Sequence, residues 1–267
     1  MSSNALSYLR QSKMPHIWCP GCGNGIVMNA IIRAIDSLGL DPRQTVIVSG
    51  IGCSSRAPGY MNFDTLHTAH GRALTFATGV KMANPALNVI VISGDGDGAA
   101  IGGNHLIHAC RRNIDITLVL VNNNIYGMTS GQYSPLTPTG ALATTAVYGN
   151  IDRPFDLVKL ASGAGATYVA RSTVYHVPQL KTYIQNAIKH HGFSVVEAVS
   201  TCPTYFGRKN KRGDAANMMV WMKDNTAVYK KGVEEYDKSL VIGEFVNIEA
   251  PEYTDSYAAL TERVGGS

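Results

Sequence analysis

Short apolar runs recur along the chain, and small or polar residues follow each of them. The clearest runs are residues 46–48, 89–92, 116–121, 168–170 and 194–199. Runs that are apolar throughout are typical of strands buried on both faces of a parallel sheet. Segments with apolar residues at helical spacing lie between them, at 24–38, 73–83, about 105–112, 156–164 and 177–190. This alternation predicts an α/β fold, with a central, mostly parallel sheet flanked by helices on both faces.

The rest of the chain has a weaker pattern. Residues 56–70 are expected to form a loop, and the regular alternation fades from Gly213 onward. The acidic stretch at 249–255 is predicted to be an extended tail. We therefore expect a cofactor-binding domain over residues 1–206, followed by a C-terminal extension over residues 207–267 that packs on a partner subunit.

Composition narrows the class of protein. With 267 residues, 45% of them hydrophobic and 16% charged, the chain can bury a large core, and its low charge hints that another subunit covers part of its surface. No apolar run approaches the roughly 18 residues that cross a bilayer, and no signal peptide is apparent, so we expect a cytoplasmic protein without a membrane partner. A net charge of +4 is too mild to indicate nucleic acid but suits an acidic protein partner.

Polar residues follow two of the predicted strands in a way that suits a bound diphosphate. The glycine-rich turn at 94–98 follows one apolar run, and Asn123 follows the next. Asp95, the Asn123 amide oxygen and a free backbone carbonyl such as that of Ile125 are hard oxygen ligands suited to Mg²⁺. The glycines let backbone N–H groups approach a phosphate closely. A tight turn with a capping aspartate, unrelated to the asparagines, is the structural alternative.

The five cysteines point to ligation rather than to disulfides, because their number is odd and no secretion signal precedes them. Cys19 and Cys22 lie in a turn before a predicted helix, and Cys53 and Cys202 lie at strand ends. Cys110 lies within a predicted helix and is expected to be a buried thiol. Four thiolates can hold structural Zn²⁺ or a [4Fe–4S] cluster. Since Cys53 shares its turn with the expected diphosphate site, where a redox-inert ion has no evident task, the cluster is favoured.

Three further features have both a functional and a structural interpretation. His67 and His70 could bind a ligand or be structural loop residues. The basic run at 208–212 is expected to be a solvated loop, or else to contact phosphate or an acidic partner. The Ser/Thr/Pro/Gly-rich loop at 134–140 lies where a loop could close over a ligand.

A set of motifs along roughly residues 16–206 resembles a known family. The motifs are Cys19-Pro20-Gly21-Cys22-Gly23, Gly50-Ile51-Gly52-Cys53-Ser54-Ser55, His67-Thr68-Ala69-His70-Gly71-Arg72, Gly94-Asp95-Gly96-Asp97-Gly98, Asn122-Asn123-Asn124-Ile125-Tyr126-Gly127-Met128-Thr129 and Cys202-Pro203-Thr204. With them the chain resembles the thiamine-diphosphate-binding β subunit of the 2-oxoacid:ferredoxin oxidoreductases, most of all the 2-oxoglutarate branch.

The resemblance implies roles for particular residues. Asp95, Asn123 and the Ile125 carbonyl would bind Mg²⁺. One [4Fe–4S] cluster would be held by Cys19, Cys22, Cys53 and Cys202. Thiamine diphosphate would be contacted by Ile51, Gly52, Cys53, Ser54, His67, His70, Gly94, Gly96, Asp97, Gly127, Met128 and Thr129. Of these, His70 is also the candidate catalytic residue.

The resemblance also implies a reaction and partners. The reaction is the oxidative decarboxylation of a 2-oxoacid, with 2-oxoglutarate favoured, by thiamine and coenzyme A, and its electrons pass through the cluster to ferredoxin. The glutamate that activates thiamine would lie on a partner α subunit of an α2β2 heterotetramer, so this chain alone is expected to be inactive. Where some relatives carry a lysine linked to coenzyme A, this chain has Ser130. The alternative is a non-redox thiamine-dependent decarboxylase or synthase subunit with structural zinc.

Overall fold

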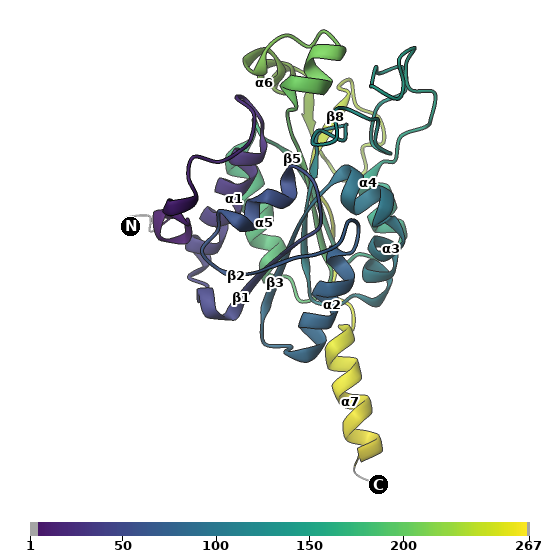
Figure 1. The fold of residues 1–267 in the computed structure, drawn as a ribbon. Helices are drawn as coiled ribbons and strands as arrows, with labels where there is room; N and C mark the ends of the chain where they lie inside the picture. The colour runs from purple at the N-terminus through teal and green to yellow at the C-terminus, as the bar shows by residue number, and fades with distance from the viewer. Residues whose placement is uncertain (1–4, 266–267) are drawn as a thin grey trace.

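The computed structural model describes residues 5–265, and its centre is one eight-stranded sheet (Figure 1). The strands lie side by side in the order β2-β1-β3-β4-β6-β5-β8-β7. All neighbouring pairs are parallel except β5 and β8, which are antiparallel. The mostly parallel α/β fold predicted from the sequence is therefore confirmed. The strands are β1 Thr45–Ser49, β2 Asp64–His67, β3 Asn88–Gly94, β4 Thr117–Asn122, β5 Tyr168–Thr173, β6 Ser194–Val199, β7 Thr226–Val228 and β8 Leu240–Asn247.

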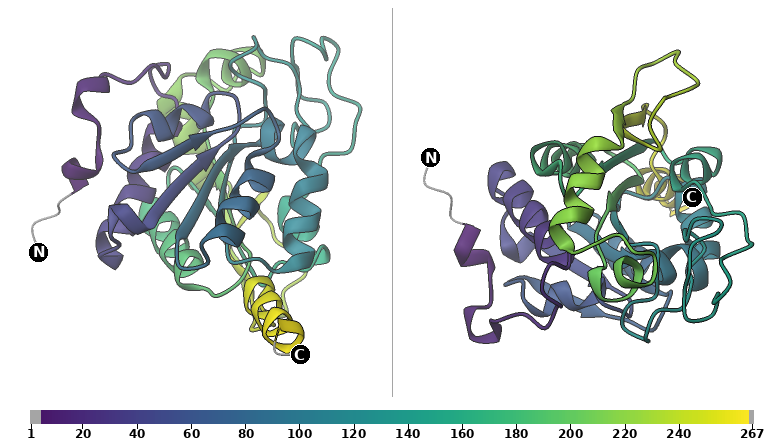
Figure 2. Two further views of the ribbon diagram at one scale, coloured as in Figure 1. Left: turned by 60° about the horizontal axis from the view of Figure 1, so that its bottom comes forward. Right: turned by 90° about the horizontal axis from the view of Figure 1, so that it is seen from above.

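Helices cover both faces of the sheet (Figure 2). On one face the core includes side chains of α1 (Asn24–Leu38) and α5 (Val177–Lys189). On the other it includes side chains of α2 (Ala73–Ala83), α3 (Gly103–Arg112) and α4 (Leu157–Gly163). The remaining α-helices of the described residues are α6 (Ala215–Asp224) and α7 (Tyr253–Gly265).

The continuous apolar runs of the central strands follow from this two-sided burial. Successive residues of a strand point to opposite faces. In β3, Ile90 and Ile92 belong to the core beneath α1 and α5, whereas Val91 belongs to the core beneath α2, α3 and α4. An apolar residue is therefore required at every position, and this requirement made the central strands predictable from the sequence.

Two predictions made from the weaker parts of the pattern are wrong. The loop expected at 56–70 contains β2, an edge strand that pairs with β1 and carries exposed ends, so that it has no continuous apolar run to reveal it. The tail expected at 249–255 is not extended throughout, because Asp255 lies in the first turn of α7. The domain boundary at residue 206 stays a prediction, although β8, which follows it, pairs with β5 in the central sheet.

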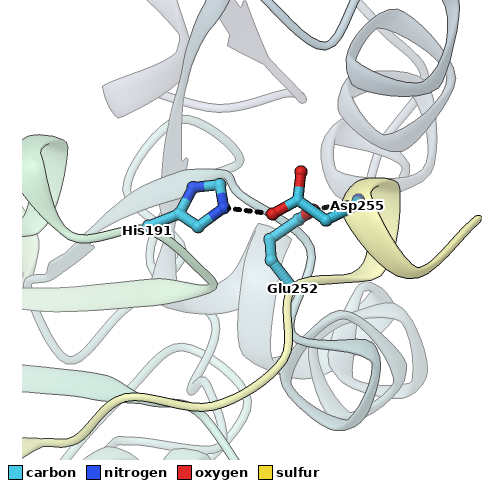
Figure 3. Close-up of side chains that lie close together, drawn as sticks. All are labelled: His191, Glu252 and Asp255. Atoms are coloured by element: carbon cyan, nitrogen blue, oxygen red, sulfur yellow. Dashed lines mark hydrogen bonds and ion pairs between the residues drawn. The ribbon is translucent and has the colours of Figure 1, made fainter. Parts of the chain in front are cut away.

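Glu252 fixes the start of α7, the helix that extends away from the body of the molecule (Figure 1). Its buried carboxylate accepts hydrogen bonds from the backbone N–H of Asp115 (2.8 Å), the Thr254 hydroxyl (2.6 Å) and the backbone N–H of Asp255 (2.9 Å). The exposed pair of His191 and Asp255 lies beside it, with Nε2 and Oδ2 2.7 Å apart (Figure 3). Because Glu252 is used as a helix cap, this group of three side chains anchors α7. Within residues 5–265, no helix has the length and apolar character needed to span a membrane.

The anchoring of α7 is expected to depend on pH through His191. The hydrogen bond to Asp255 raises the pKa of His191 above its usual range. The stabilisation is then fully present below the unfolded-state pKa and is lost as the pH rises through the raised pKa of the folded state. Amide protection factors at the start of α7 should fall as the pH rises above about 6.5, the ordinary pKa of histidine, as measured by hydrogen exchange. The His191→Gln variant should show no such fall, and an equal fall in this variant would refute the role of His191.

Candidate functional site

The predicted site residues come together at the carboxyl edge of the sheet, because β1, β3, β4 and β6 are parallel and end on the same side. The segments that follow β1, β2, β3 and β4 enclose one cavity. Its lining consists of Ile51, Gly52, Cys53, Ser54, His70, Gly94, Asp95, Gly96, Asp97, Asn123, Ile125, Tyr126, Gly127, Met128 and Thr129. His67 does not line it, since its Nδ1 lies 2.9 Å from the Ser49 hydroxyl instead.

Asp97 holds together the segments that form this cavity. One oxygen of its buried carboxylate accepts hydrogen bonds from the backbone N–H of Ile51 (3.1 Å) and of Gly71 (2.8 Å), and it lies 2.6 Å from Nδ1 of His70. The other oxygen accepts a hydrogen bond from the Ser93 hydroxyl. Three stretches of chain are thereby joined at a single carboxylate, which suits a role in positioning the cavity wall.

Glycine is required where this carboxylate and a tyrosine ring approach the backbone. A Cβ atom on Gly50 would lie 2.1 Å from a carboxylate oxygen of Asp97, and one on Gly96 would lie 2.3 Å from the ring of Tyr126. The Tyr126 hydroxyl in turn donates a hydrogen bond to the Gly96 carbonyl (2.9 Å). Tyr126 is thus a wall residue that the sequence analysis did not select, although it lies within one of the quoted motifs.

Asp95 and Asn123 provide a donor set that fits Mg²⁺. The Asp95 side chain is buried and accepts hydrogen bonds from the Gly96 N–H (2.9 Å) and the Ser134 hydroxyl (2.6 Å). Among residues 5–265 it forms no ion pair, and burial raises its pKa to about 7 against those hydrogen bonds. A buried carboxylate without a cation, beside a buried amide, is the arrangement that a hard metal ion would stabilise.

His70 is oriented by its neighbours. Its Nδ1 is hydrogen-bonded to the Asp97 carboxylate, and its ring contacts that of Tyr126 edge-on, with the ring centroids 6.2 Å apart. The imidazole lines the cavity, which leaves Nε2 as the ring nitrogen not used by Asp97. The geometry therefore gives His70 a fixed ring and one nitrogen free to exchange a proton.

A second cavity of about 260 Å³ contains the predicted cysteine ligands. Cys19, Cys22, Cys53 and Cys202 all line it. The two cavities share part of their lining, namely Cys53, Asn123, Gly127 and Met128. At this common wall a Cβ atom on Gly127 would lie 3.4 Å from Sγ of Cys53 and 3.7 Å from Sγ of Cys202.

The four thiols form a ligand set that fits a thiolate-bound metal centre. Burial raises the pKa of Cys22 to about 11 and that of Cys53 to about 12, and the neighbouring thiols add to both shifts. Such thiols become thiolates readily only when a cation binds them.

The side chain of Asn24 lies against one of these thiols. Asn24 begins α1, two residues after Cys22, and hydrogen bonds from its backbone and its buried side chain oppose the rise that burial causes in the pKa of the Cys22 thiol. Cys110, by contrast, is fully buried within α3 and takes no part, as predicted.

Comparisons with known proteins agree with this geometry. Residues 50–198 match the model of the thiamine pyrophosphate enzyme C-terminal TPP-binding domain. The chain is 52% identical to the KorB subunit of 2-oxoglutarate synthase from Methanothermobacter marburgensis over 98% of its own length and 93% of the relative. It is 53% identical to the same subunit from Methanocaldococcus jannaschii over 97% and 98%.

A solved structure is similar over almost the whole chain. It is a 2-oxoglutarate:ferredoxin oxidoreductase from Magnetococcus marinus with 2-oxoglutarate, coenzyme A and succinyl-CoA bound. The similarity has a TM-score of 0.88 at 34% identity and covers 98% of this chain and 91% of that one.

The packing of Gly96 against Tyr126 gives a test of the first cavity. Gly96→Ala would force the ring away at a cost of about 1–3 kcal/mol, so cofactor binding should weaken roughly 5- to 150-fold. Binding of thiamine diphosphate with Mg²⁺ to the assembled enzyme is measured by calorimetry. The control is Gly79→Ala, which meets no atom within 4 Å. It lies within α2 and should leave binding unchanged while stabilising the helix by about 0.5–1 kcal/mol. Equal binding by the two variants would contradict the assignment.

Proposed function

The chain belongs to the thiamine-diphosphate-binding β subunits of the 2-oxoacid:ferredoxin oxidoreductases, and from this membership we propose the detailed function of its two cavities. The first holds thiamine diphosphate and Mg²⁺, and the second holds one [4Fe–4S] cluster. The assembled enzyme oxidatively decarboxylates 2-oxoglutarate with coenzyme A and delivers the electrons to ferredoxin. The observation that carries this proposal is the wall shared by the cavities, at Cys53 and Gly127.

The ligands of the first cavity follow from its donor atoms. Asp95, the Asn123 amide oxygen and the Ile125 carbonyl are proposed to bind Mg²⁺, which in proteins usually joins few protein ligands to phosphate oxygens. In the turns at 50–54 and 94–98, the N–H groups of Ile51 and Gly96 are used by Asp97 and Asp95, so other backbone N–H groups of these turns would contact the diphosphate. When bound, thiamine diphosphate would supply the electron sink that decarboxylation of a 2-oxoacid needs.

In that reaction, side chains of this chain would orient the cavity wall and exchange protons. Asp97 keeps the His70 ring fixed through Nδ1, and we assign His70 Nε2 the task of exchanging a proton with the bound substrate or cofactor. The Tyr126 hydroxyl donates a hydrogen bond to the Gly96 carbonyl and so helps to hold the turn at 94–98 in place. The direct ligand contacts of Ile51, Gly52, Ser54, Met128 and Thr129 stay a prediction, as does the one made for His67.

The second cavity supplies the electron route. Cys19, Cys22, Cys53 and Cys202 are proposed as cluster ligands, and when bound the cluster would accept electrons one at a time. Support comes from the four cysteines that line one cavity and from the polar side chain of Asn24 beside Cys22. Since Gly127 lies against both Cys53 and Cys202, only a thin layer of protein separates the two cavities.

A partner subunit completes the first cavity. Within residues 5–265 that cavity contains Asp95 and Asp97 but no glutamate. Large apolar side chains at and near its mouth are exposed: Ile51 by 37%, Ile101 by 47% and Met128 by 48%. Exposed apolar residues around a polar site are typical of a subunit interface. We propose that an α subunit covers this surface in an α2β2 assembly and brings the carboxylate that activates thiamine.

The activity is tested on the assembled, anaerobically purified enzyme. With coenzyme A and methyl viologen as the electron acceptor, 2-oxoglutarate should be oxidised with a kcat/KM at least roughly tenfold above that for pyruvate. The isolated β subunit should be inactive, because it lacks the partner's carboxylate. Equal rates with both oxoacids would overturn the substrate assignment, and CO₂ release without viologen reduction would overturn the redox assignment.

The cluster is tested with a pair of cysteine variants. Cys53→Ser should abolish the visible absorption of the anaerobic protein together with its iron and acid-labile sulfide, because one of four ligands is lost. Cys110→Ser changes a buried thiol within α3 and should retain the cluster. Metal and sulfide analysis gives the readout. Stoichiometric zinc without iron in the unmodified protein would instead identify a structural zinc site.

A further inference from the structure

An open groove lies on the other side of the cluster cavity. It is enclosed by the N-terminal arm over residues 5–20, by α1 and by the start of α6. Figure 2 shows the arm standing beside α1 at the edge of the molecule. Cys19 and Cys22 line both this groove and the cluster cavity. The turn that carries these two cysteines is therefore the partition between the cluster and the groove.

The proposed cluster site reaches the surface at Cys19. Of the four cysteines, Cys19 is the exposed one, whereas Cys22 and Cys53 are half-buried and Cys202 is buried. Apolar side chains of both cavities are also exposed, with Leu6 of the groove at 69% and Ile17 of the cluster cavity at 71%. An exposed apolar surface beside a redox centre suits contact with another protein.

Basic side chains predominate around the groove. Residues 5–35 include Arg10, Lys13 and Arg33 and contain no aspartate or glutamate. The loop at 208–212, which leads toward α6, has basic residues at four of its five positions. The nearest acidic residues along the chain are Asp36, one turn after Arg33 on α1, and Asp214, which caps α6. A basic rim around an apolar floor attracts and orients a partner of negative charge.

We propose that this groove is the docking surface of a small, acidic one-electron carrier protein. The inference rests on the proposed function, because it requires the cluster. Oxidation of one 2-oxoacid releases two electrons, which leave singly and reduce two oxidised carrier molecules in succession. The carrier's redox centre would face Cys19, and its acidic side chains would meet Lys13, Arg33 and the basic loop. The carrier thus docks on a surface separate from the mouth of the thiamine cavity.

Charge-reversal variants of the assembled enzyme test this surface. Arg33→Glu and Lys13→Glu both change exposed side chains. Within residues 5–265, the Arg33 side chain bonds only to Asn29, one turn earlier on α1. Each should raise the KM for an acidic bacterial-type ferredoxin about 5- to 10-fold at low salt. The difference from the unmodified enzyme should shrink at high salt, where the charges are screened. The rate with methyl viologen, a small cationic acceptor, should not change.

The control is Lys189→Glu. Lys189 is the last residue of α5, exposed, and precedes β6 at the amino edge of the sheet. The Lys189→Glu variant has the same change of charge at a site far from Cys19. It should leave the KM for ferredoxin within about twofold of its original value.

The possible results separate this inference from the proposed function. An unchanged KM for ferredoxin in both Arg33→Glu and Lys13→Glu would overturn the docking surface. So would loss of the α–β assembly in size-exclusion chromatography, because the groove would then hold the partner subunit. If the unmodified enzyme reduces neither viologen nor ferredoxin, the proposed function itself fails.

Discussion

The cavity at the carboxyl edge of the sheet depends on one buried carboxylate. Asp97 accepts hydrogen bonds from the Ile51 and Gly71 backbones and from Ser93, and it holds His70 through Nδ1. These groups belong to segments that follow or precede different strands, so no local interaction could fix their relative positions. Hydrogen bonds to a charged acceptor are about twice as strong as neutral ones, and a buried carboxylate that lost them would be strongly unfavourable. The site is thus preorganised by a residue whose oxygen atoms are already occupied by the protein.

A second consequence of the parallel sheet is that the two proposed prosthetic groups are neighbours. The turn after β1 carries Ile51 at the first cavity and Cys53 at the wall between the two. The charges of the two sites also act on each other, because Asp95 adds to the effect of burial in raising the pKa of both Cys53 and Cys202. A metal ion beside Asp95 would reduce that repulsion. Binding in the first cavity and the charge on the sulfurs are therefore coupled through space.

The sequence revealed those features that a single segment determines. The central strands were predictable because burial on both faces requires continuous apolar runs. The meeting of the cysteines at one cavity was predictable because the carboxyl ends of parallel strands lie at the same edge of a sheet. The edge strand β2 was missed since half of its surface meets water. Tyr126, Ser134 and Asn24 were missed as site residues because their importance lies in contacts with distant groups, such as that of Ser134 with Asp95. The same limit applies to His67, whose partner Ser49 lies on the adjacent strand.

The arrangement of the surface follows from the order of events in the reaction. A substrate must reach the first cavity, whose mouth bears exposed apolar residues such as Met128 and lacks a glutamate within the described residues. In the proposed function, electrons leave the second cavity, whose lining includes the exposed Cys19. If both surfaces were one, a partner subunit that closed the first cavity would compete with the electron carrier. A cluster behind the wall at Cys53 and Gly127 would separate the two contacts, so that the carrier could exchange while the first cavity stayed closed to water.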